Sequence, residues 1–291
     1  MKLAGVFAAL PTSFDHLGDV YRAKITQNVD RWNRAELAGY LVAGRAGEGV
    51  LLNAEEKLMV WELAAQEAKT GAMLLAGISA QSVQETLELT KQAAKIGYHA
   101  AVVSPPLMEN FTPDRTSLYY RSVADQASLP IVVDNLPVDN PMNVSMTAIT
   151  ALAEHPNIVA VVGGFAEGQD DFELLNSLSK DFAVFVGDSP NPVPWLTAGS
   201  SGMISGFAAM APFFFLNLAE AVRTREYDAA RDLERRAQKL VSLLLHHHGI
   251  PGLKYALDLN GYYGGLARLP LPPLTSRAKQ EIETVIHGIR S

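Results

Sequence analysis

Residues 131–162 read IVVDNLPVDNPMNVSMTAITALAEHPNIVAVV and contain one complete strand–helix–strand unit. Ile131–Asn135 and Ile158–Val162 are short runs rich in β-branched residues. They show little polar alternation, which is typical of strands buried on both faces of a parallel sheet. Between them, apolar residues recur at helical spacing over residues 145–154. This stretch therefore predicts one βα unit followed by the next parallel strand.

The same alternation of strands and helices extends in both directions, from residue 3 to about residue 224. The other predicted strands are Leu3–Leu10, Gly39–Ala43, Ala72–Ala76, Ala100–Ser104, Ala183–Gly187 and Gly202–Ser205. The other predicted helices cover residues 20–36, 54–69, 82–96, 114–127, 169–179, 190–198 and 207–224. Consecutive units of this kind predict an α/β fold, a closed (β/α)8 TIM barrel, whose usual length is about 250 residues.

A doubly wound open sheet is the competing fold for this pattern. That fold normally carries a glycine-rich dinucleotide-binding loop after its first strand. Here the first strand ends in Leu10-Pro-Thr-Ser-Phe14, which has no such loop. The barrel is therefore the better prediction.

After residue 224 the pattern changes to helices alone. Three helices are expected, over Glu226–His246, Ile250–Leu259 and Ser276–Ile289. The sequence thus predicts a barrel over residues 1–224 and a C-terminal three-helix extension over residues 225–291.

The composition excludes several classes of function. The 291 residues include no cysteine, so disulfides, thiolate metal sites and a cysteine nucleophile are absent. The 24 Lys and Arg against 31 Asp and Glu give a net charge of −7, with no long basic block, which argues against nucleic acid as a partner. No apolar stretch reaches the roughly 18 residues that cross a membrane. We expect a soluble, cytoplasmic protein with no membrane partner.

In a barrel of this type, working residues lie at the carboxyl ends of the strands and in the loops that follow. The candidates at those places are Thr12-Ser13, Gly44–Glu48, Gly77, Ser104–Leu107, Asp134–Pro137, Val162–Gly164, Gly187–Ser189 and Ser205-Gly206.

Several of these segments, taken in order, resemble the motifs of one family. They are Ala9–Phe14 (ALPTSF), Gly44–Glu48 (GRAGE), Asp134–Pro137 (DNLP), Gly187-Asp188, Gly202–Ser205 (GMIS) and Leu269–Leu271 (LPL). The chain resembles the pyruvate-dependent class I aldolases and lyases grouped with dihydrodipicolinate synthase and N-acetylneuraminate lyase. The resemblance implies a barrel with a trailing helical part, lyase chemistry on a keto acid without a cofactor, and a homodimer or homotetramer.

The resemblance also locates the reactive lysine of the family, whose amine forms an imine with pyruvate. In this chain that place is occupied by Val162, which cannot form an imine. None of the ten lysines falls at the carboxyl end of a predicted strand. The sequence therefore predicts a family member without Schiff-base chemistry, a candidate pseudoenzyme.

Other family residues are replaced as well. The proton-shuttling tyrosine corresponds to Asp134, and the family's P-Y-Y segment reads Pro105-Pro106-Leu107. The threonine pair that binds the pyruvate carboxylate becomes Arg45-Ala46. The surrounding Gly44, Gly47, Glu48, Asn135, Pro137 and Gly202 keep the family pattern. This combination indicates a retained scaffold with a rebuilt or abandoned site.

Two interpretations of Arg45 remain open. Its guanidinium could hold a small carboxylate or keto acid in bidentate fashion, with Ala46, Gly47, Gly187 and Ser205 as further ligand-binding positions. It could instead pair internally with Asp134 or Glu48. The leading hypothesis is a family member without imine chemistry that either binds a small carboxylate or keto acid at Arg45 without turnover or has a structural or regulatory role. The alternative is an active lyase or hydratase acting on a keto acid, with Asp134 as acid/base and Arg45 holding the carboxylate, although a neighbouring guanidinium would weaken that base.

For the other polar and aromatic residues that could take part in chemistry, we expect structural roles. Glu48 is expected to anchor loop backbone, and His246–His248 to form a solvated helix end. A metal site built from His16, Glu109, Asp134 and Asp188 lacks any H-x-H or H-x-x-x-H spacing, so we expect no metal and no cofactor. Phe213–Phe215 is expected to pack against other parts of the protein.

Overall fold

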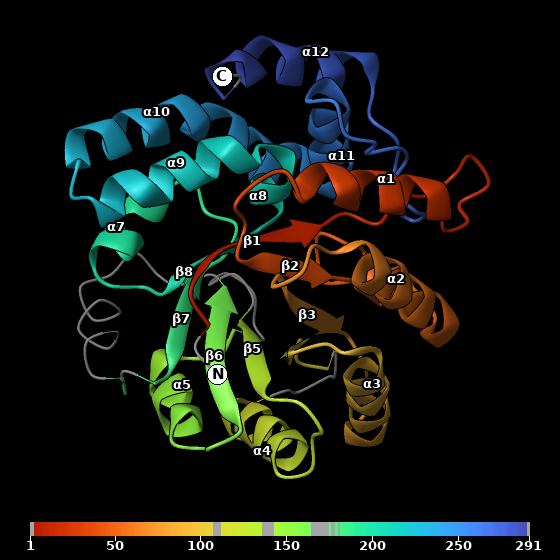
Figure 1. Cartoon of the computed structure of the whole chain (residues 1–291), viewed down its shortest axis with the longest axis vertical. Helices are drawn as coiled ribbons and strands as arrows, with labels where there is room; N and C mark the ends of the chain where they lie inside the picture. Colours follow the sequence, from red (N-terminus) through yellow and green to blue (C-terminus); the bar gives the residue numbers. More distant parts are fainter. Residues whose placement is uncertain are drawn as a thin grey trace.

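The computed structural model describes residues 3–106, 112–135, 143–163, 175, 178–179 and 181–289, and it shows a closed barrel of eight parallel strands (Figure 1). The strands are β1 (Gly5–Leu10), β2 (Gly39–Val42), β3 (Met73–Ile78), β4 (Ala100–Val103), β5 (Ile131–Asn135), β6 (Ile158–Gly163), β7 (Ala183–Val186) and β8 (Gly202–Ser205). They follow one another around the barrel in chain order, and β8 pairs with β1 to close it. The predicted fold class is confirmed, with strand ends within two residues of those expected.

Helices connect the strands and surround the barrel (Figure 1). They are α1 (Arg22–Trp32), α2 (Ala54–Glu67), α3 (Val83–Ile96), α4 (Pro113–Ala124), α5 (Met146–Ala153), α7 (Pro192–Thr197), α8 (Gly206–Met210) and α9 (Pro212–Arg223). Several begin at a side-chain cap, as in α2, where Asn53 and Glu56 form a reciprocal capping box. Most of the predicted helix over residues 169–179 lies outside the described residues.

The sequence predicts a single helix over residues 207–224. This prediction is wrong, because two helices, α8 and α9, occupy that stretch. Ala211, between α8 and α9, has a φ of −141°, which is far from helical. Pro212 follows it, and proline disfavours the helical conformation of the residue before it. The break turns the chain sharply after the short helix that follows β8.

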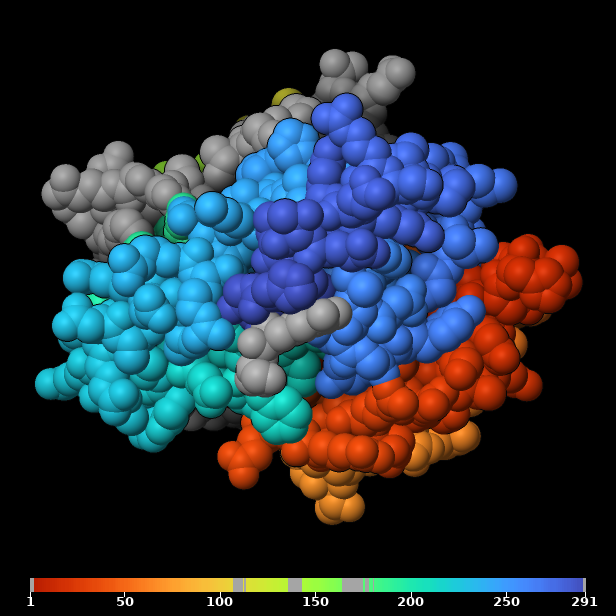
Figure 2. Space-filling view, turned by 90° about the horizontal axis from the view of Figure 1, so that it is seen from above, coloured from red at the N-terminus to blue at the C-terminus, as the bar shows by residue number. Residues whose placement is uncertain are grey.

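The C-terminal extension consists of α10 (Tyr227–Leu243), a π-helical turn (Leu244–His248), α11 (Gly249–Leu259), α12 (Ser276–Val285) and a final 3-10 turn (Ile286–Gly288). In Figure 2 the part of the extension drawn in darker blue, C-terminal to α10, lies beside the N-terminal segment, in red. Trp32 of α1 donates its indole N–H to the Ala209 carbonyl (2.7 Å) and stacks on Tyr262 with 5.2 Å between ring centroids. The boundary proposed at residue 225 stays a prediction, and one buried apolar cluster joins residues from both sides of it.

No helix in the described part of the chain is long and apolar enough to span a membrane.

Closure of the barrel depends on a glycine at the start of β8. An alanine Cβ at Gly202 (φ +145°) would lie 2.0 Å from the Gly5 carbonyl oxygen of β1. At Gly199 (φ +107°), a Cβ would meet no atom within 4 Å. We predict that Gly199→Ala lowers the free energy of unfolding by about 1–3 kcal/mol through backbone strain alone. Gly202→Ala should lower it further, because β1 and β8 must also separate. Urea denaturation of both variants tests this, and equal losses would contradict it.

Candidate functional site

The carboxyl ends of β2, β4 and β5 bring three polar side chains together. Arg45 Nη2 lies 3.3 Å from Asp134 Oδ1, and the Ser104 hydroxyl donates to Asp134 Oδ2 at 2.7 Å. The Asp134 side chain is 7% exposed, whereas that of Arg45 is 40% exposed. Of the two alternatives for Arg45, the internal ion pair with Asp134 is present, and the guanidinium still reaches solvent. Leu107, Glu109, Pro137 and Gly164 lie outside the described residues.

The alternation of side chains along β5 explains this arrangement. Asn135, the neighbour of Asp134, points to the opposite face of the strand. Its side chain accepts a hydrogen bond from the Val144 N–H (2.8 Å) and donates to the Val144 carbonyl (3.2 Å). Across the sheet, Asp134 pairs in register with Val162 of β6. Val162 is buried and apolar, so the end of β6 offers no amine beside Asp134.

The loop that carries Arg45 is held by its backbone. The Thr12 hydroxyl donates to the Gly47 carbonyl (2.6 Å), and the Glu48 N–H donates to the Arg45 carbonyl (3.0 Å). Glu48 has a φ of +56°, a left-handed conformation that non-glycine residues rarely adopt. A side chain at Gly47 would come within 2.8 Å of the Leu10 carbonyl. These contacts fix the position from which Arg45 projects.

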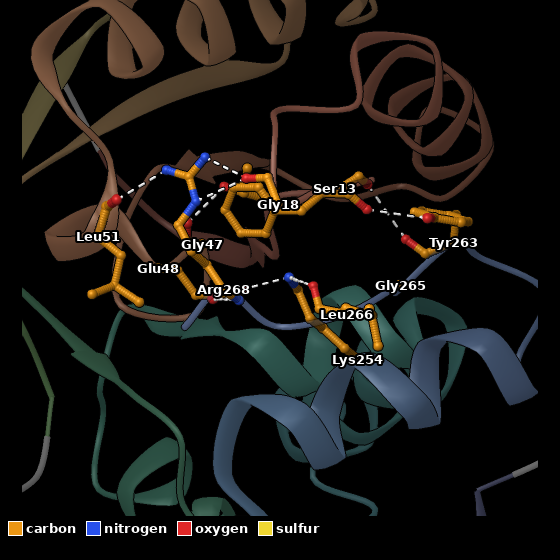
Figure 3. Close-up of polar contacts among 12 residues, drawn as sticks. Ser13, Gly18, Gly47, Glu48, Leu51, Lys254, Tyr263, Gly265, Leu266 and Arg268 are labelled. Atoms are coloured by element: carbon orange, nitrogen blue, oxygen red, sulfur yellow. Dashed lines mark hydrogen bonds and ion pairs between the residues drawn. The ribbon is translucent and has the colours of Figure 1, made fainter. Parts of the chain in front are cut away.

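A fully enclosed ion pair holds this loop to the C-terminal extension (Figure 3). Lys254 Nζ of α11 lies 2.5 Å from Glu48 Oε1, and both side chains are 0% exposed. Lys254 also donates to the Leu266 carbonyl (2.8 Å), while Glu48 Oε2 accepts the Arg268 N–H (2.7 Å). Burial lowers the pKa of Lys254, and the Glu48 carboxylate opposes that shift. The predicted anchoring role of Glu48 is confirmed by these contacts.

Arg268 adds a second link between the extension and the barrel loops. Its guanidinium donates to both carboxylate oxygens of Glu56 (2.7 and 2.6 Å) and to the carbonyls of Gly18 and Leu51. It lies 4.4 Å from the ring centroid of Phe14, as does Lys254 Nζ. The Arg268 partner lowers the pKa of Glu56. Sequence reasoning missed Lys254 and Arg268; the signal available for the first was a single lysine within the otherwise apolar run of residues 250–257.

At the ends of β7 and β8, the hydroxyl of the candidate residue Ser205 already makes hydrogen bonds within the protein. Ser205 donates to Asp188 Oδ1 (2.6 Å) and accepts the Phe207 N–H (3.0 Å), so it caps α8. A Cβ placed on Gly206 would lie 3.2 Å from Ala46 Cβ and 2.8 Å from Leu253 Cδ2. Leu253 of the extension therefore approaches the Arg45-Ala46 segment. Ligand binding by Ala46, Gly47, Gly187 and Ser205 stays a prediction.

The histidine and phenylalanine runs differ partly from expectation. His246 and His247 are exposed, but His248 Nε2 lies 3.1 Å from Glu281 Oε2 of α12, with only 12% of its side chain exposed. The prediction of a solvated end is thus wrong for His248, because α12 packs beside the π-helical turn. Phe214 and Phe215 are buried, whereas Phe213 is 55% exposed. Among the described residues, no three His, Asp or Glu side chains are placed to hold a metal ion.

Comparison with known proteins decides the kinship of this barrel. A model of the dihydrodipicolinate synthetase family matches residues 2–289. The chain belongs to this family. The resemblance inferred from the sequence motifs is therefore confirmed. Arg45, Asp134 and Val162 lie at the mouth of a barrel of this family.

Individual relatives agree over nearly the whole chain. The 4-hydroxy-tetrahydrodipicolinate synthase of Exiguobacterium sibiricum is 30% identical over 271 residues, covering 92% of this chain and 91% of that protein. The dihydrodipicolinate synthase DapA-2 of Bacillus anthracis superposes with a TM-score of 0.93 at 24% identity, covering all of both chains. The sialic acid aldolase of Ruminococcus gnavus superposes with a TM-score of 0.89 at 19% identity, covering 98% and 96%. The last two show the shared fold.

The enclosed pair makes a direct prediction about stability. Lys254→Met leaves the Glu48 carboxylate buried without a cation, so the free energy of unfolding should fall by about 3–5 kcal/mol. The double variant Lys254→Met with Glu48→Gln should recover much of that loss, since the glutamine oxygen still accepts the Arg268 N–H. Chemical denaturation measures both. A double variant as unstable as the sum of the single changes would contradict the pairing.

Proposed function

We propose that this family member binds a small carboxylate or keto acid at the barrel mouth through Arg45 and carries out no Schiff-base aldol chemistry. The observation that carries the proposal is that Val162, the residue expected at the place of the family's reactive lysine, lies in register with an Asp134 that is already paired with Arg45. The family scaffold around these residues is intact, which supports a retained binding site with altered chemistry.

Arg45 has the geometry of a carboxylate-binding residue. Only its Nη2 atom is engaged, by Asp134, within the part of the chain that the structure describes. A planar guanidinium presents further N–H groups, which can bind both oxygens of a carboxylate. Its 40% exposure allows a ligand to approach from solvent. Asp134 balances the charge of Arg45 while the site is empty, so an incoming anion competes with Asp134.

The buried lysines of the described residues offer no ready substitute for the missing amine. Lys57 donates to the Ser79 carbonyl (2.9 Å). Lys254 is fully enclosed between Glu48, the Leu266 carbonyl and the Phe14 ring. An imine requires a free amine that a ketone can reach. Lys2 and Lys180 lie outside the described residues.

The alternative function, a lyase or hydratase with Asp134 as the base, is less well supported. Oδ1 of Asp134 pairs with Arg45, and Oδ2 accepts the hydroxyl of Ser104. A carboxylate stabilised at both oxygens has a reduced tendency to take a proton from a substrate. The same contacts suit a fixed counter-ion, so binding is the function that we favour.

Reductive trapping tests the absence of imine chemistry. We predict that borohydride reduction in the presence of pyruvate leaves the intact mass of the protein unchanged. An active dihydrodipicolinate synthase, treated in parallel, should gain a reduced pyruvyl group and serves as the positive control. A stable adduct on this protein, mapped by peptide mass spectrometry to Lys254 or any other lysine, would refute the proposal.

Charge substitutions test the binding role. We predict that Arg45→Ala abolishes the binding of pyruvate or acetate, measured by calorimetric titration. Asp134→Asn should tighten binding by about tenfold, because the ligand no longer competes with an internal anion; tenfold corresponds to about 1.4 kcal/mol. Arg235→Ala, which removes the same charge from an exposed site on α10, is the matched control. Binding that survives Arg45→Ala would exclude Arg45 as its source.

We also propose that the chain acts in the cytoplasm as a homodimer or homotetramer. Membership of the dihydrodipicolinate synthetase family supports this proposal. Light scattering on a size-exclusion column measures the mass of the assembly directly.

A further inference from the structure

Asp188 places a second carboxylate at the barrel mouth, two residues after the end of β7. Its Oδ1 atom accepts the Ser205 hydroxyl (2.6 Å) and the Gly206 N–H (2.9 Å). Ser205 is only 1% exposed, so a buried hydroxyl fixes the orientation of this carboxylate. Asp188 itself is exposed, and its Oδ2 atom has no hydrogen-bond or ion-pair partner among the described residues. One oxygen therefore holds the side chain in place, and the other remains available as an acceptor.

The available oxygen of Asp188 lies on the side of the mouth that carries Arg45. A Cβ built on Gly206 would lie 3.8 Å from Asp188 Oδ2 and 3.2 Å from the Cβ of Ala46, the residue after Arg45. Asp188 Oδ2 and Ala46 Cβ are thus both within 4 Å of one point. In the described part of the chain Arg45 pairs with Asp134, and it makes no ion pair with Asp188. A cationic and an anionic group therefore flank the mouth without neutralising each other.

Three hydroxyls at the ends of β1, β4 and β8 already donate their hydrogens to acceptors of the protein. Thr12 donates to the Gly47 carbonyl (2.6 Å), Ser104 to Asp134 Oδ2 (2.7 Å) and Ser205 to Asp188 Oδ1 (2.6 Å). Each hydroxyl has a single hydrogen to donate. A ketone oxygen, which can only accept, therefore gains no hydrogen bond from these groups. The Oδ2 atom of Asp188, in contrast, suits a ligand group that donates.

The charges at the mouth favour a ligand that brings a positive group with its carboxylate. Arg45 carries one positive charge, whereas Asp134 and Asp188 carry two negative charges. A simple carboxylate or a keto acid adds a further negative charge to this set. A zwitterion adds no net charge, and its two charged groups can each face a group of opposite sign. Electrostatic complementarity of this kind discriminates between ligands of the same size.

We propose that the ligand of the barrel mouth is a small α-amino acid in its zwitterionic form, an inference that rests on the carboxylate-binding role of Arg45 proposed above. The carboxylate of the ligand accepts N–H groups of the Arg45 guanidinium, and its ammonium group donates to Asp188 Oδ2. Both contacts are charge-assisted hydrogen bonds, which are stronger than neutral ones. The same arrangement selects against a keto acid of equal carbon skeleton, because the ketone oxygen would face a carboxylate acceptor.

Calorimetric titration of the full-length protein with L-alanine, pyruvate and propionate tests the proposal, because these carboxylates differ only in the group on the second carbon. We expect alanine to bind at least about tenfold more tightly than pyruvate. Asp188→Asn should weaken alanine binding by at least about tenfold and should not weaken propionate binding. The asparagine oxygen still accepts the Ser205 hydroxyl and the Gly206 N–H, so this variant keeps the fold. Asp232→Asn, which makes the same charge change on α10 beside Arg235, should bind alanine like the unmodified protein.

Two results would overturn the proposal: binding of pyruvate as tight as that of alanine, or equal binding of alanine by Asp188→Asn and the unmodified protein. If propionate still binds in either case, and Arg45→Ala abolishes that binding, the carboxylate-binding role of Arg45 stands and only the amino acid inference fails. If none of the three carboxylates binds, the proposed function is wrong, and the amino acid inference falls with it.

Discussion

Two fully enclosed charges, on Glu48 and Lys254, hold the C-terminal extension against the loop that carries Arg45. Removing either partner would leave the other charge buried without its counter-ion, a costly state. The pair therefore makes the left-handed turn at Glu48 dependent on the position of α11. Arg45 lies three residues before Glu48, and its carbonyl accepts the Glu48 N–H in the same turn. The barrel mouth therefore takes its shape from a helix more than 200 residues away in the sequence.

The residues at the mouth form a connected set. Val162 at the end of β6 lies in register with Asp134 of β5, and Asp134 pairs with Arg45 after β2. These two charges neutralise each other, and Ser104 satisfies the second oxygen of Asp134. Such mutual satisfaction is what a buried polar network requires to be stable. Arg45, Asp134 and Ser104 thus form an ion-paired and hydrogen-bonded site at the barrel mouth, and they do not form an apolar plug.

The fold could be predicted from sequence because each βα unit carries its own signal, as in residues 131–162, where a β-branched run and a helical period alternate. The break between α8 and α9 was missed although Pro212 marks it, since the apolar period continues across the proline. At the site, the pairing of Arg45 with Asp134 followed from opposite charges at strand ends that the barrel topology brings together. The partner of Lys254 could not be inferred in this way. The apolar run of residues 250–257 marks this lysine as an exception, but its partner depends on how α11 packs against the barrel loops.

The contrast between Lys254 and Arg45 shows why the number of lysines in a sequence is a poor guide to imine chemistry. Lys254 has the burial that lowers an amine's pKa, a property shared by reactive lysines. It is nevertheless bound to a carboxylate and a carbonyl with no exposed surface, so a keto acid has no path to its nitrogen. Arg45 is exposed but cannot form an imine. In this barrel Lys254 has a lowered pKa but no exposed surface, whereas Arg45 is exposed to solvent but cannot form an imine. This separation supports a site that binds a carboxylate without forming a covalent bond to it.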